Sequence, residues 1–235
     1  MLRSFGVGAM LLIGLTVGCS SSDPAEPAPI LTPLSSLEVV SRSSEALANV
    51  TSFRFALSHD GGNTILTNGI QVQQASGTAL APDSYTLAAD TLVAGFFVNT
   101  EVVVIDQDAY MTHPITRQWQ LLGPDASPFG NFNPALLVSS ILEQVSDPVM
   151  GFGYTTQPVG YLIDGNLPAA ALSSLTGGVD EAAPALKVRV SVDATTFLPV
   201  EARVTGRATV NESSDLIRTV RLFEFDSDIA IEPPI

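Results

Sequence analysis

The sequence predicts an α+β fold in which one large, curved antiparallel β-sheet carries two or three helices on one face. From residue 52 onward, short segments alternate apolar and polar residues and are separated by Gly, Pro, Asn and Asp, a pattern typical of strands joined by turns. Two stretches, residues 35–49 and 134–145, instead space their apolar residues as helices do. Because most strands follow one another without a helix between them, the sheet is expected to be an antiparallel meander rather than a parallel sheet.

The first element is expected to be a helix over residues 35–49. Ser35 and Ser36 are available as N-terminal caps, and Glu38 lies in the first turn. Apolar residues recur near helical spacing at Leu34, Leu37, Val40, Leu47 and Val50.

The strands begin directly after this helix. Phe53, Phe55 and Leu57 alternate with polar or small residues, and a turn signal at residues 61–63 follows. Similar segments succeed one another at residues 65–79, 84–93, 95–107, 109–114 and 117–123.

A second helix is expected after Asn133, which can cap it, with Pro134 at its first position. It carries a wide apolar stripe that includes Leu137 and Ile141. A shorter third helix is predicted over residues 167–175, closed by two glycines. The chain then returns to alternating strand patterns at residues 186–192, 197–210 and 217–229.

Residues 1–18 are expected to be a secretory signal that is removed. Arg3 supplies positive charge, an uncharged run of 13 residues extends from Phe5 to Val17, and Gly18 precedes Cys19. That run is shorter than the roughly 20 apolar residues that a transmembrane helix needs. The order is typical of a lipobox, in which Cys19 becomes the acylated (palmitate-bearing) N-terminus and anchors the protein to the outer face of the cell membrane.

The mature chain is expected to have two parts. Residues 19–33 are rich in Ser, Pro, Ala and acid and are predicted to be a disordered tether behind the lipidated cysteine. Residues 34–235 are long enough for one domain with a sizeable core. Since Cys19 is the only cysteine, that domain is stabilised by packing without a disulfide.

Charge excludes some partners. The chain has 24 acidic and 10 basic residues, whereas nucleic-acid binding needs clustered Lys and Arg. The same imbalance disfavours electrostatic adhesion to anionic lipid, so membrane attachment is expected to depend on the acyl group on Cys19.

We predict no catalytic residue, no metal site and no cofactor. His59 and His113 are the histidines available as bases, and the sequence contains no G-x-S-x-G motif. The pairs Asp106/Asp108 and Asp226/Asp228 have spacing that could suggest a metal site, but they lie at strand ends, where solvated turn carboxylates are commoner.

The apolar content, 46% of residues, is more than a minimal core requires. Residues 77–82 and 85–90 offer small side chains opposite a wide apolar helix stripe, so a curved sheet could leave a lipid-sized cavity. The alternative is a completely filled core. Alternate residues of a strand point to the same face of the sheet, so the candidate lining residues are taken from one face of the strands and from the apolar stripe of the second helix. They are Phe53, Phe55, Ile70, Val72, Leu87, Val102, Val104, Leu137, Ile141, Val188 and Val190.

Several segments, taken in order, resemble the LppX/LprAFG family of envelope lipoproteins, which are similar to the LolA/LolB lipid carriers. They are the lipobox at Cys19, residues 49–57, residues 109–119, residues 132–145, and residues 160–172 with Gly160, Gly165 and Pro168. The resemblance implies a half-barrel of antiparallel strands around helices and a hydrophobic cavity that holds acylated lipid.

The resemblance implies a carrier that moves acylated lipids or lipoglycans across the cell envelope, with a membrane transporter as a candidate for loading or receiving them. The low basic content favours a neutral lipid over an anionic one. The alternative is a structural or regulatory envelope lipoprotein that acts through protein–protein contacts. A third hypothesis is an enzyme that acts on lipid.

Overall fold

The computed structural model describes residues 33–235, except 107, 124–126, 128, 130–131, 152–154 and 157–158. The signal segment, Cys19 and nearly all of the tether therefore lie outside the described residues. The helices are α1 (Ser36–Ala48), α2 (Pro134–Gln144), the short 3-10 helix η1 (Ala169–Leu172) and α3 (Ser173–Thr176). The strands are β1 (Ser52–Asp60), β2 (Thr64–Ile65), β3 (Gln71–Leu80), β4 (Ser84–Val93), β5 (Phe96–Ile105), β6 (Asp108–Thr112), β7 (Trp119–Leu122), β8 (Ser146–Met150), β9 (Thr155–Thr156), β10 (Val159–Leu167), β11 (Leu186–Asp193), β12 (Pro199–Thr205) and β13 (Ile217–Phe223).

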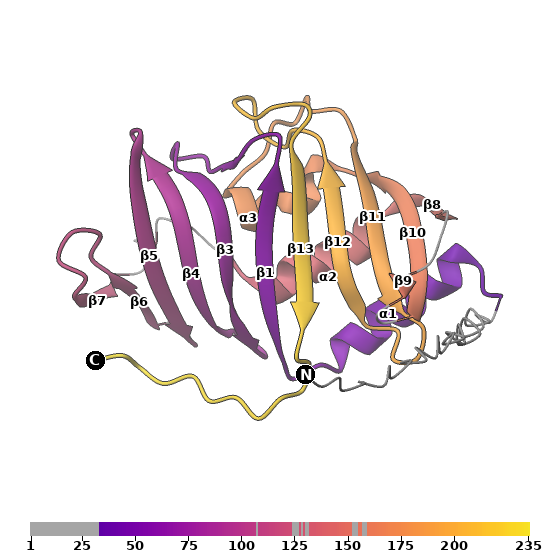
Figure 1. Cartoon of the computed structure of the whole chain (residues 1–235), viewed down its shortest axis with the longest axis horizontal. Helices are drawn as coiled ribbons and strands as arrows, with labels where there is room; N and C mark the ends of the chain where they lie inside the picture. The colour runs from indigo at the N-terminus through magenta and orange to yellow at the C-terminus, as the bar shows by residue number, and fades with distance from the viewer. Residues whose placement is uncertain are drawn as a thin grey trace, which may run out of the picture. The chain divides into compact units, whose positions relative to one another are not determined.

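In the described part of the chain, the strands form one 13-stranded sheet, and every printed pairing is antiparallel. The order is β7-β6-β5-β4-β3-β1-β13-β12-β11-β10-β8, with β2 on β3 and β9 on β10 (Figure 1). The last strand, β13, lies beside the first, so the sheet consists of two meanders joined at its centre. The predicted fold class, one large antiparallel sheet with helices, is confirmed.

The first two helices begin and end within one residue of the prediction, whereas the third, predicted over residues 167–175, begins at Ala169 and ends at Thr176. The Ser35 hydroxyl accepts a hydrogen bond from the Glu38 amide at the start of α1. Asn133 caps α2 by accepting from two amides, with Pro134 at the first position. The third helical segment is η1 followed by α3, and it closes at Gly177, whose φ of 74° suits glycine.

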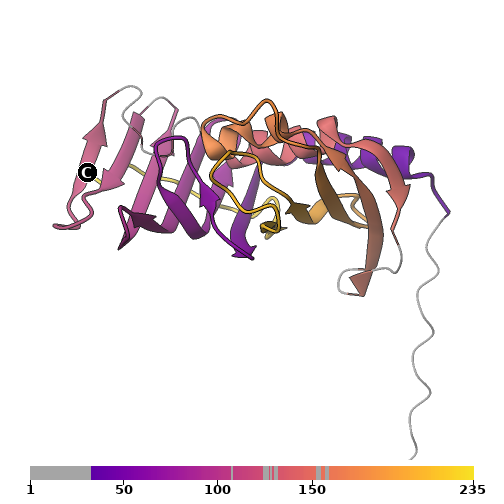
Figure 2. The same cartoon turned by 90° about the horizontal axis from the view of Figure 1, so that it is seen from above.

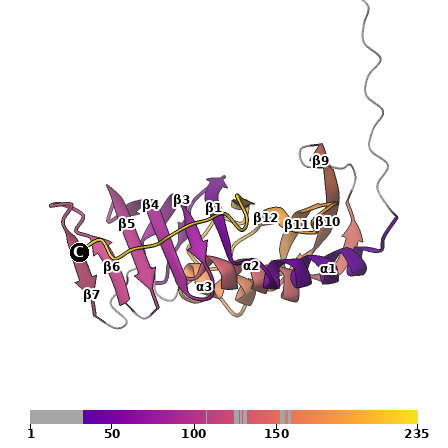
Figure 3. The ribbon, with the colours of Figure 1, turned by 90° about the horizontal axis from the view of Figure 1, so that it is seen from below.

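All three helices pack on one side of the sheet (Figure 2). In the order of the sheet, they lie behind the strands from β1 through β13, β12 and β11 to β10, whereas β4 to β7 extend beyond them, as the view from below also shows (Figure 3). The helix side buries Phe53, Phe55 and Leu57 of β1, in the alternation that the sequence predicted.

Small residues of β3 lie directly opposite these large ones. Phe53 pairs with Ala79, Phe55 with Gly77, and Leu57 with Ala75. A Cβ atom at Gly77 would lie 1.9 Å from the Thr86 carbonyl oxygen and 2.9 Å from the Phe55 ring. Glycine is therefore required there, and it lets the Phe55 ring lie against the backbone of the sheet.

The structure contains two longer strands that the sequence analysis did not predict, β8 and β10. Glycine, aspartate and asparagine within residues 159–167 have the composition of a turn, which hid the strand. Gly165 is needed because a Cβ there would lie 2.6 Å from the Val145 side chain, where the pairing of β10 with β8 shifts register.

Three predicted strands were clearly too long. The strand predicted over residues 65–79 divides into β2, which ends at Ile65, and β3, which begins at Gln71. The strand predicted over residues 197–210 ends at Thr205, because Gly206 turns the chain and Glu212 then binds the amides of Ala208 and Thr209. The strand predicted over residues 217–229 ends at Phe223, since Glu224 adopts a φ of 52°. None of the helices in the described ranges combines the length and apolarity needed to cross a bilayer.

Candidate lipid-binding site

An apolar pocket lies on the helix side of the sheet, between strands β1, β3 and β4 and helix α3. Its volume is about 20 Å³, somewhat less than the roughly 30 Å³ that one molecule occupies in liquid water. All of its lining residues are apolar: Leu57, Leu66, Val72, Ala75, Leu87, Ala89, Phe129, Phe132 and Leu175. The pocket has the chemistry for a hydrocarbon chain, but it is too small to accept one without movement of its walls.

Two phenylalanines from the segment before α2 fill most of the space over the small residues of β3 and β4. The Phe132 ring lies 6.1 Å from the Phe55 ring and 5.7 Å from the Tyr85 ring, which it meets edge to face. Phe129 and Phe132 are both buried. The pocket is therefore small because these two rings occupy it.

Tyr85 contributes a hydroxyl group to this aromatic cluster. Its ring is buried on the helix side of β4, and burial raises the pKa of its hydroxyl to about 12. The hydroxyl is therefore neutral at physiological pH, and the wall stays uncharged.

The structure gathers the predicted lining residues into one hydrophobic core, but only some of them border the pocket. Val72 and Leu87 line it, and Phe55 contacts Phe132. Phe53 borders a second hollow of about 50 Å³ between the ends of α1 and α2. The remaining predicted residues belong to the core or pack against it: Ile70, Val102, Val104, Leu137, Ile141, Val188 and Val190.

Four residues of the pocket were not among the predicted lining residues: Phe129, Phe132, Leu66 and Leu175. Phe129 and Phe132 lie in a stretch of Ser, Pro, Gly and Asn, whose composition indicates a loop and gives no periodicity. The signal that could have found them is the pair of aromatic residues, because large apolar side chains in a turn-rich segment are usually buried.

A buried polar network lies where β1 ends and β13 begins, beside the strand β2 that leads to the pocket. The Arg218 guanidinium and the Glu212 carboxylate form an ion pair whose side chains are 1% and 0% exposed. Glu212 also accepts hydrogen bonds from the amides of Ile65, Ala208 and Thr209. Burial opposes its charge, but Arg218 and the amides of Ile65 and Ala208 together lower the pKa of Glu212.

His59 completes this network as a neutral ring. The Thr64 hydroxyl accepts from Arg218 Nε at 2.9 Å, so its own proton is available to His59 Nε2 at 2.7 Å. The other ring nitrogen, Nδ1, then donates to the Gln73 carbonyl at 2.8 Å. Burial, together with the nearby Arg218, lowers the pKa of His59. The network holds β2, which leads into the pocket residue Leu66.

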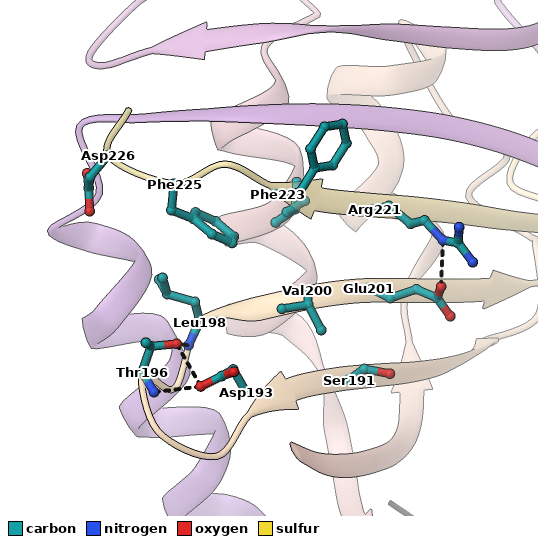
Figure 4. A pocket seen from close by; sticks show the side chains of 11 residues that line it. Ser191, Asp193, Thr196, Leu198, Val200, Glu201, Arg221, Phe223, Phe225 and Asp226 are labelled. Carbon is teal, nitrogen blue, oxygen red and sulfur yellow. Dashed lines mark hydrogen bonds and ion pairs between the residues drawn. The ribbon is translucent and has the colours of Figure 1, made fainter. Parts of the chain in front are cut away.

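A second, open hollow of about 830 Å³ lies on the opposite face of the sheet, over β11, β12 and β13 (Figure 4). Its apolar wall includes Leu198, Val200, Phe223 and Phe225. Glu201 accepts from Arg221 Nε at 2.9 Å across its floor. The hollow is amphipathic and accessible, unlike the pocket under the helices.

The carboxylates at the rim of this hollow stabilise local turns. Asp193 accepts from the amides of Thr195 and Thr196. Asp226 accepts from the amide and the hydroxyl of Thr51, which lower the pKa of its carboxyl. Through these hydrogen bonds, Asp226 stabilises a turn.

The other candidate polar residues are dispersed in the structure. His113 Nδ1 accepts from the amides of Ile115 and Thr116 at 3.2 Å and thus shapes a hairpin turn. Asp108 begins β6, paired with Ile105. Among the residues that the structure describes, no three His, Cys, Asp or Glu side chains gather as a metal site would require.

The comparisons with known proteins agree with the resemblance seen in the sequence. A family model described as LppX_LprAFG lipoprotein matches residues 36–231. The crystal structure of LprF from Mycobacterium bovis is similar at 13% identity with a TM-score of 0.63, covering 85% of this chain and 96% of that chain.

The crystal structure of the lipoprotein LppX from Mycobacterium tuberculosis is similar at 15% identity with a TM-score of 0.56, covering 83% of this chain and 97% of that chain. At these identities the two likenesses establish the fold. No curated protein sequence matches the chain.

Proposed function

Because this chain belongs to the LppX_LprAFG lipoprotein family, whose members are lipid-binding envelope lipoproteins, we propose that it is a membrane-anchored carrier of acylated lipid or lipoglycan. In this proposal the acyl chains bind between the sheet and the helices, and the protein carries them across the cell envelope. The observation that carries the proposal is the wholly apolar pocket over the small residues of β3 and β4.

The energetics of lipid transfer require such a site. A chain of about 16 carbons that leaves a bilayer loses about 12 kcal/mol of apolar burial, at about 0.8 kcal/mol per CH₂. A carrier must return nearly all of this free energy, which only a dry cavity can do. No catalytic residue is needed for this exchange.

We place the acyl chain where the rings of Phe129 and Phe132 lie in this structure. Behind these rings, Ala75, Gly77 and Ala89 leave no side chain beyond a methyl group on the sheet. Displacement of the two rings would therefore open an apolar groove in which Leu57, Val72 and Leu87 flank these small residues. Each ring buries roughly 150–250 Å² of surface, an area that an acyl chain would replace with similar hydrophobic stabilisation.

The charge distribution supports a neutral lipid. Arg42, Arg54, Arg189, Arg207, Arg218 and Arg221 each pair with a carboxylate of this chain. An anionic head group would have to compete with these carboxylates for its partners. A lipid with an uncharged head group meets no such competition.

The anchor remains part of the proposal, since residues 1–18, Cys19 and the tether to residue 33 precede the described domain. Fourteen tether residues at roughly 3 Å each would let the domain reach about 40 Å from the bilayer. Metabolic labelling with a fatty-acid analogue should mark the full chain and spare Cys19→Ala. Equal labelling of both would remove the anchor from the proposal.

One observation favours the alternative function in protein–protein contacts. The open hollow of about 830 Å³ on the other face of the sheet is far larger than the apolar pocket. Its exposed Phe223 and its ion pair between Glu201 and Arg221 are features of protein-binding surfaces.

The two functions are distinguished by the contents of the purified protein. The full chain, expressed as a lipoprotein and purified in detergent, is analysed by native mass spectrometry and by organic extraction. A carrier should release a non-covalent lipid in addition to the acyl groups on Cys19. If only the covalent acyl groups are found, and the free domain takes up no lipid from vesicles, the protein-binding function would replace the carrier.

A further inference from the structure

We propose that the edge of the sheet distant from the helices inserts into the surface of a lipid bilayer through an apolar tip. This tip comprises Val93, Phe96 and Phe97 of the β4–β5 hairpin and Ile115 of the β6–β7 hairpin. The inference rests on the proposed function, because it assigns the surface by which the carrier receives or delivers its lipid.

The tip exposes more apolar surface than any structural role requires. Phe96, Phe97 and Ile115 are 75%, 63% and 84% exposed, and Val93 is 39% exposed. Single exposed apolar residues are ordinary, but a group of large ones on adjacent hairpins marks an interaction surface. Phenylalanine is also one of the residues that surface-bound amphipathic elements bury at the boundary between head groups and acyl chains.

The backbone holds this surface in a defined position. Val93 pairs with Phe96, and the two residues between them, Ala94 and Gly95, have φ angles of 49° and 83°. This is the two-residue hairpin turn with positive φ at both positions, which is tight and matches the twist of the strands. The phenylalanines therefore project from a short turn rather than from a long loop.

The second hairpin lies at the same end of the sheet. Strands β4 to β7 are antiparallel neighbours in sequence order, so the β4–β5 and β6–β7 turns emerge at one end. Arg117, in the β6–β7 turn, donates from Nη2 to the Asn99 side chain at 2.8 Å and from Nη1 to the Asn99 carbonyl. These bonds fasten the turn that carries Ile115 to β5.

The charge of this edge suits a lipid surface. The chain has 24 acidic and 10 basic residues, yet residues 91–100 and 109–120 contain no Asp or Glu. They contain Arg117 and His113 instead. An acidic protein is repelled by an anionic bilayer, and this edge is a place where it can approach one without that repulsion.

A row of valines, Phe96 and the buried Thr91, none of them charged, connects the tip to the pocket. Residues that pair across two strands lie on the same face of a sheet. Phe96 pairs with Val93, and Thr91 pairs with both Val98 and Val72, so these residues all lie on the helix side. Val72 lines the apolar pocket. Two strand spacings separate β5 from β3, about 10 Å, so an acyl chain that leaves the bilayer at the tip has a short path without a charged side chain.

Insertion is tested directly with a tryptophan at the tip. The full acylated chain carrying Phe97→Trp and Trp119→Phe, which then has a single tryptophan, is reconstituted in phosphatidylcholine vesicles with and without brominated acyl chains. Its control carries Leu136→Trp and Trp119→Phe, because Leu136 is 58% exposed on α2, away from this edge. We expect bromine to quench the tip tryptophan several-fold more strongly than the control. Equal quenching at the two sites would overturn the inference, whether or not another protein binds the tip.

The role in transfer is tested with Phe96→Ser/Phe97→Ser against Leu136→Ser. Since both phenylalanines are exposed, the double variant should fold normally and keep its copurified lipid. Its rate of lipid transfer between vesicles should fall at least about tenfold, because the loss of two inserted rings weakens bilayer contact by more than the 1.4 kcal/mol that corresponds to a factor of ten. An unchanged rate would contradict the inference while leaving a lipid-loaded carrier intact. Conversely, strong quenching of the tip tryptophan in a chain that never contains lipid would uphold the docking surface and reject the carrier.

Discussion

The two halves of the sheet use the same alternation of residues with different results. In the half formed by β10 to β13, Ile163 and Val192 are fully buried beneath the helices. Beyond this core, Phe197 stacks on Tyr161 with ring centroids 6.1 Å apart, and Arg42 of α1 lies over Phe197. In the half formed by β4 to β7, no described helix covers the outer strands, and Phe96 and Phe97 remain exposed (Figure 1).

The difference shows where a ligand can enter. A close-packed core resists added volume, because its neighbours have no room to move. The apolar pocket lies at the border between the two halves, where small residues of β3 and β4 face two phenylalanines from a loop segment. On the helix face of the sheet, apolar surface is therefore available to a lipid toward the half formed by β4 to β7, which the helices leave uncovered.

The largest effect is expected at the polar network near the centre of the sheet. Glu212→Ala leaves the Arg218 guanidinium buried without its carboxylate and should lower the free energy of unfolding by about 3–5 kcal/mol. Glu201→Ala removes the partner of Arg221, which is 69% exposed, and should cost about 0–1 kcal/mol. Chemical denaturation of the full chain measures both, and equal losses would show that the network does not stabilise the junction of the halves.

A larger side chain should have different effects in the two halves of the sheet. Val190→Trp inserts a large ring into the core under the helices and should destabilise the fold by about 1–3 kcal/mol or more. Val104→Trp lies on the helix side of β5, where Val104 is only partly buried, and should leave the fold intact while lowering lipid occupancy. If Val104→Trp unfolds the protein as readily as Val190→Trp, the uncovered half is as closely packed as the covered half.

These two substitutions also illustrate how far the sequence could predict the site. Strand parity correctly placed Val104, Val188 and Val190 on the apolar face, because the pleat decides that face. It could not say which of them the helices cover, since coverage depends on how the chain returns from β7 to α2. The segment between β7 and α2 contains Phe129 and Phe132, and its sequence shows neither helical nor strand periodicity.

The fold was more predictable than the site for the same reason. Capping residues and periodicity identified α1 and α2 from local sequence alone. By contrast, β10 was missed because Gly165 is required by the Val145 side chain, a neighbour 20 residues earlier in the chain that no local pattern reveals.

A smaller effect is expected from the titration of His59. Burial lowers its pKa in the folded protein below the unfolded value of 6.5, so its stabilising contribution is complete above pH 6.5. As the pH falls below 6.5, the unfolded chain takes up a proton that the folded chain does not, and stability declines until the folded pKa is passed. The charged groups that face His59 are Arg218 and Glu212, and the Glu212 carboxyl loses its own contribution only at lower pH.

Thermal unfolding between pH 8 and pH 5.5 measures this decline. His59→Gln should flatten the profile in that window, because glutamine does not titrate. A decline of the same size in the variant would show that His59 is not its source.

The smallest effect is expected from salt and chelators. Acyl transfer into an apolar site releases no counterion and deprotonates no metal ligand. Lipid transfer should therefore proceed at similar yield with chelator and across roughly 50–500 mM salt, a range that strongly screens exposed charges. Loss of transfer with chelator would instead implicate Asp106/Asp108 or Asp226/Asp228, and a steep decline with salt would indicate an anionic head group bound by arginine.

The most direct test of the central claim compares two neighbouring alanines of β4. Ala89 lines the apolar pocket and is 1% exposed, whereas Ala88 faces the other side of the sheet and is exposed. Lipid occupancy of the full chain is measured by native mass spectrometry for Ala89→Trp and Ala88→Trp, and circular dichroism verifies that each is folded. We predict that Ala89→Trp loses most of its lipid while Ala88→Trp retains it. A folded Ala89→Trp protein with the same lipid content as Ala88→Trp would contradict the account, because the lipid would then bind elsewhere.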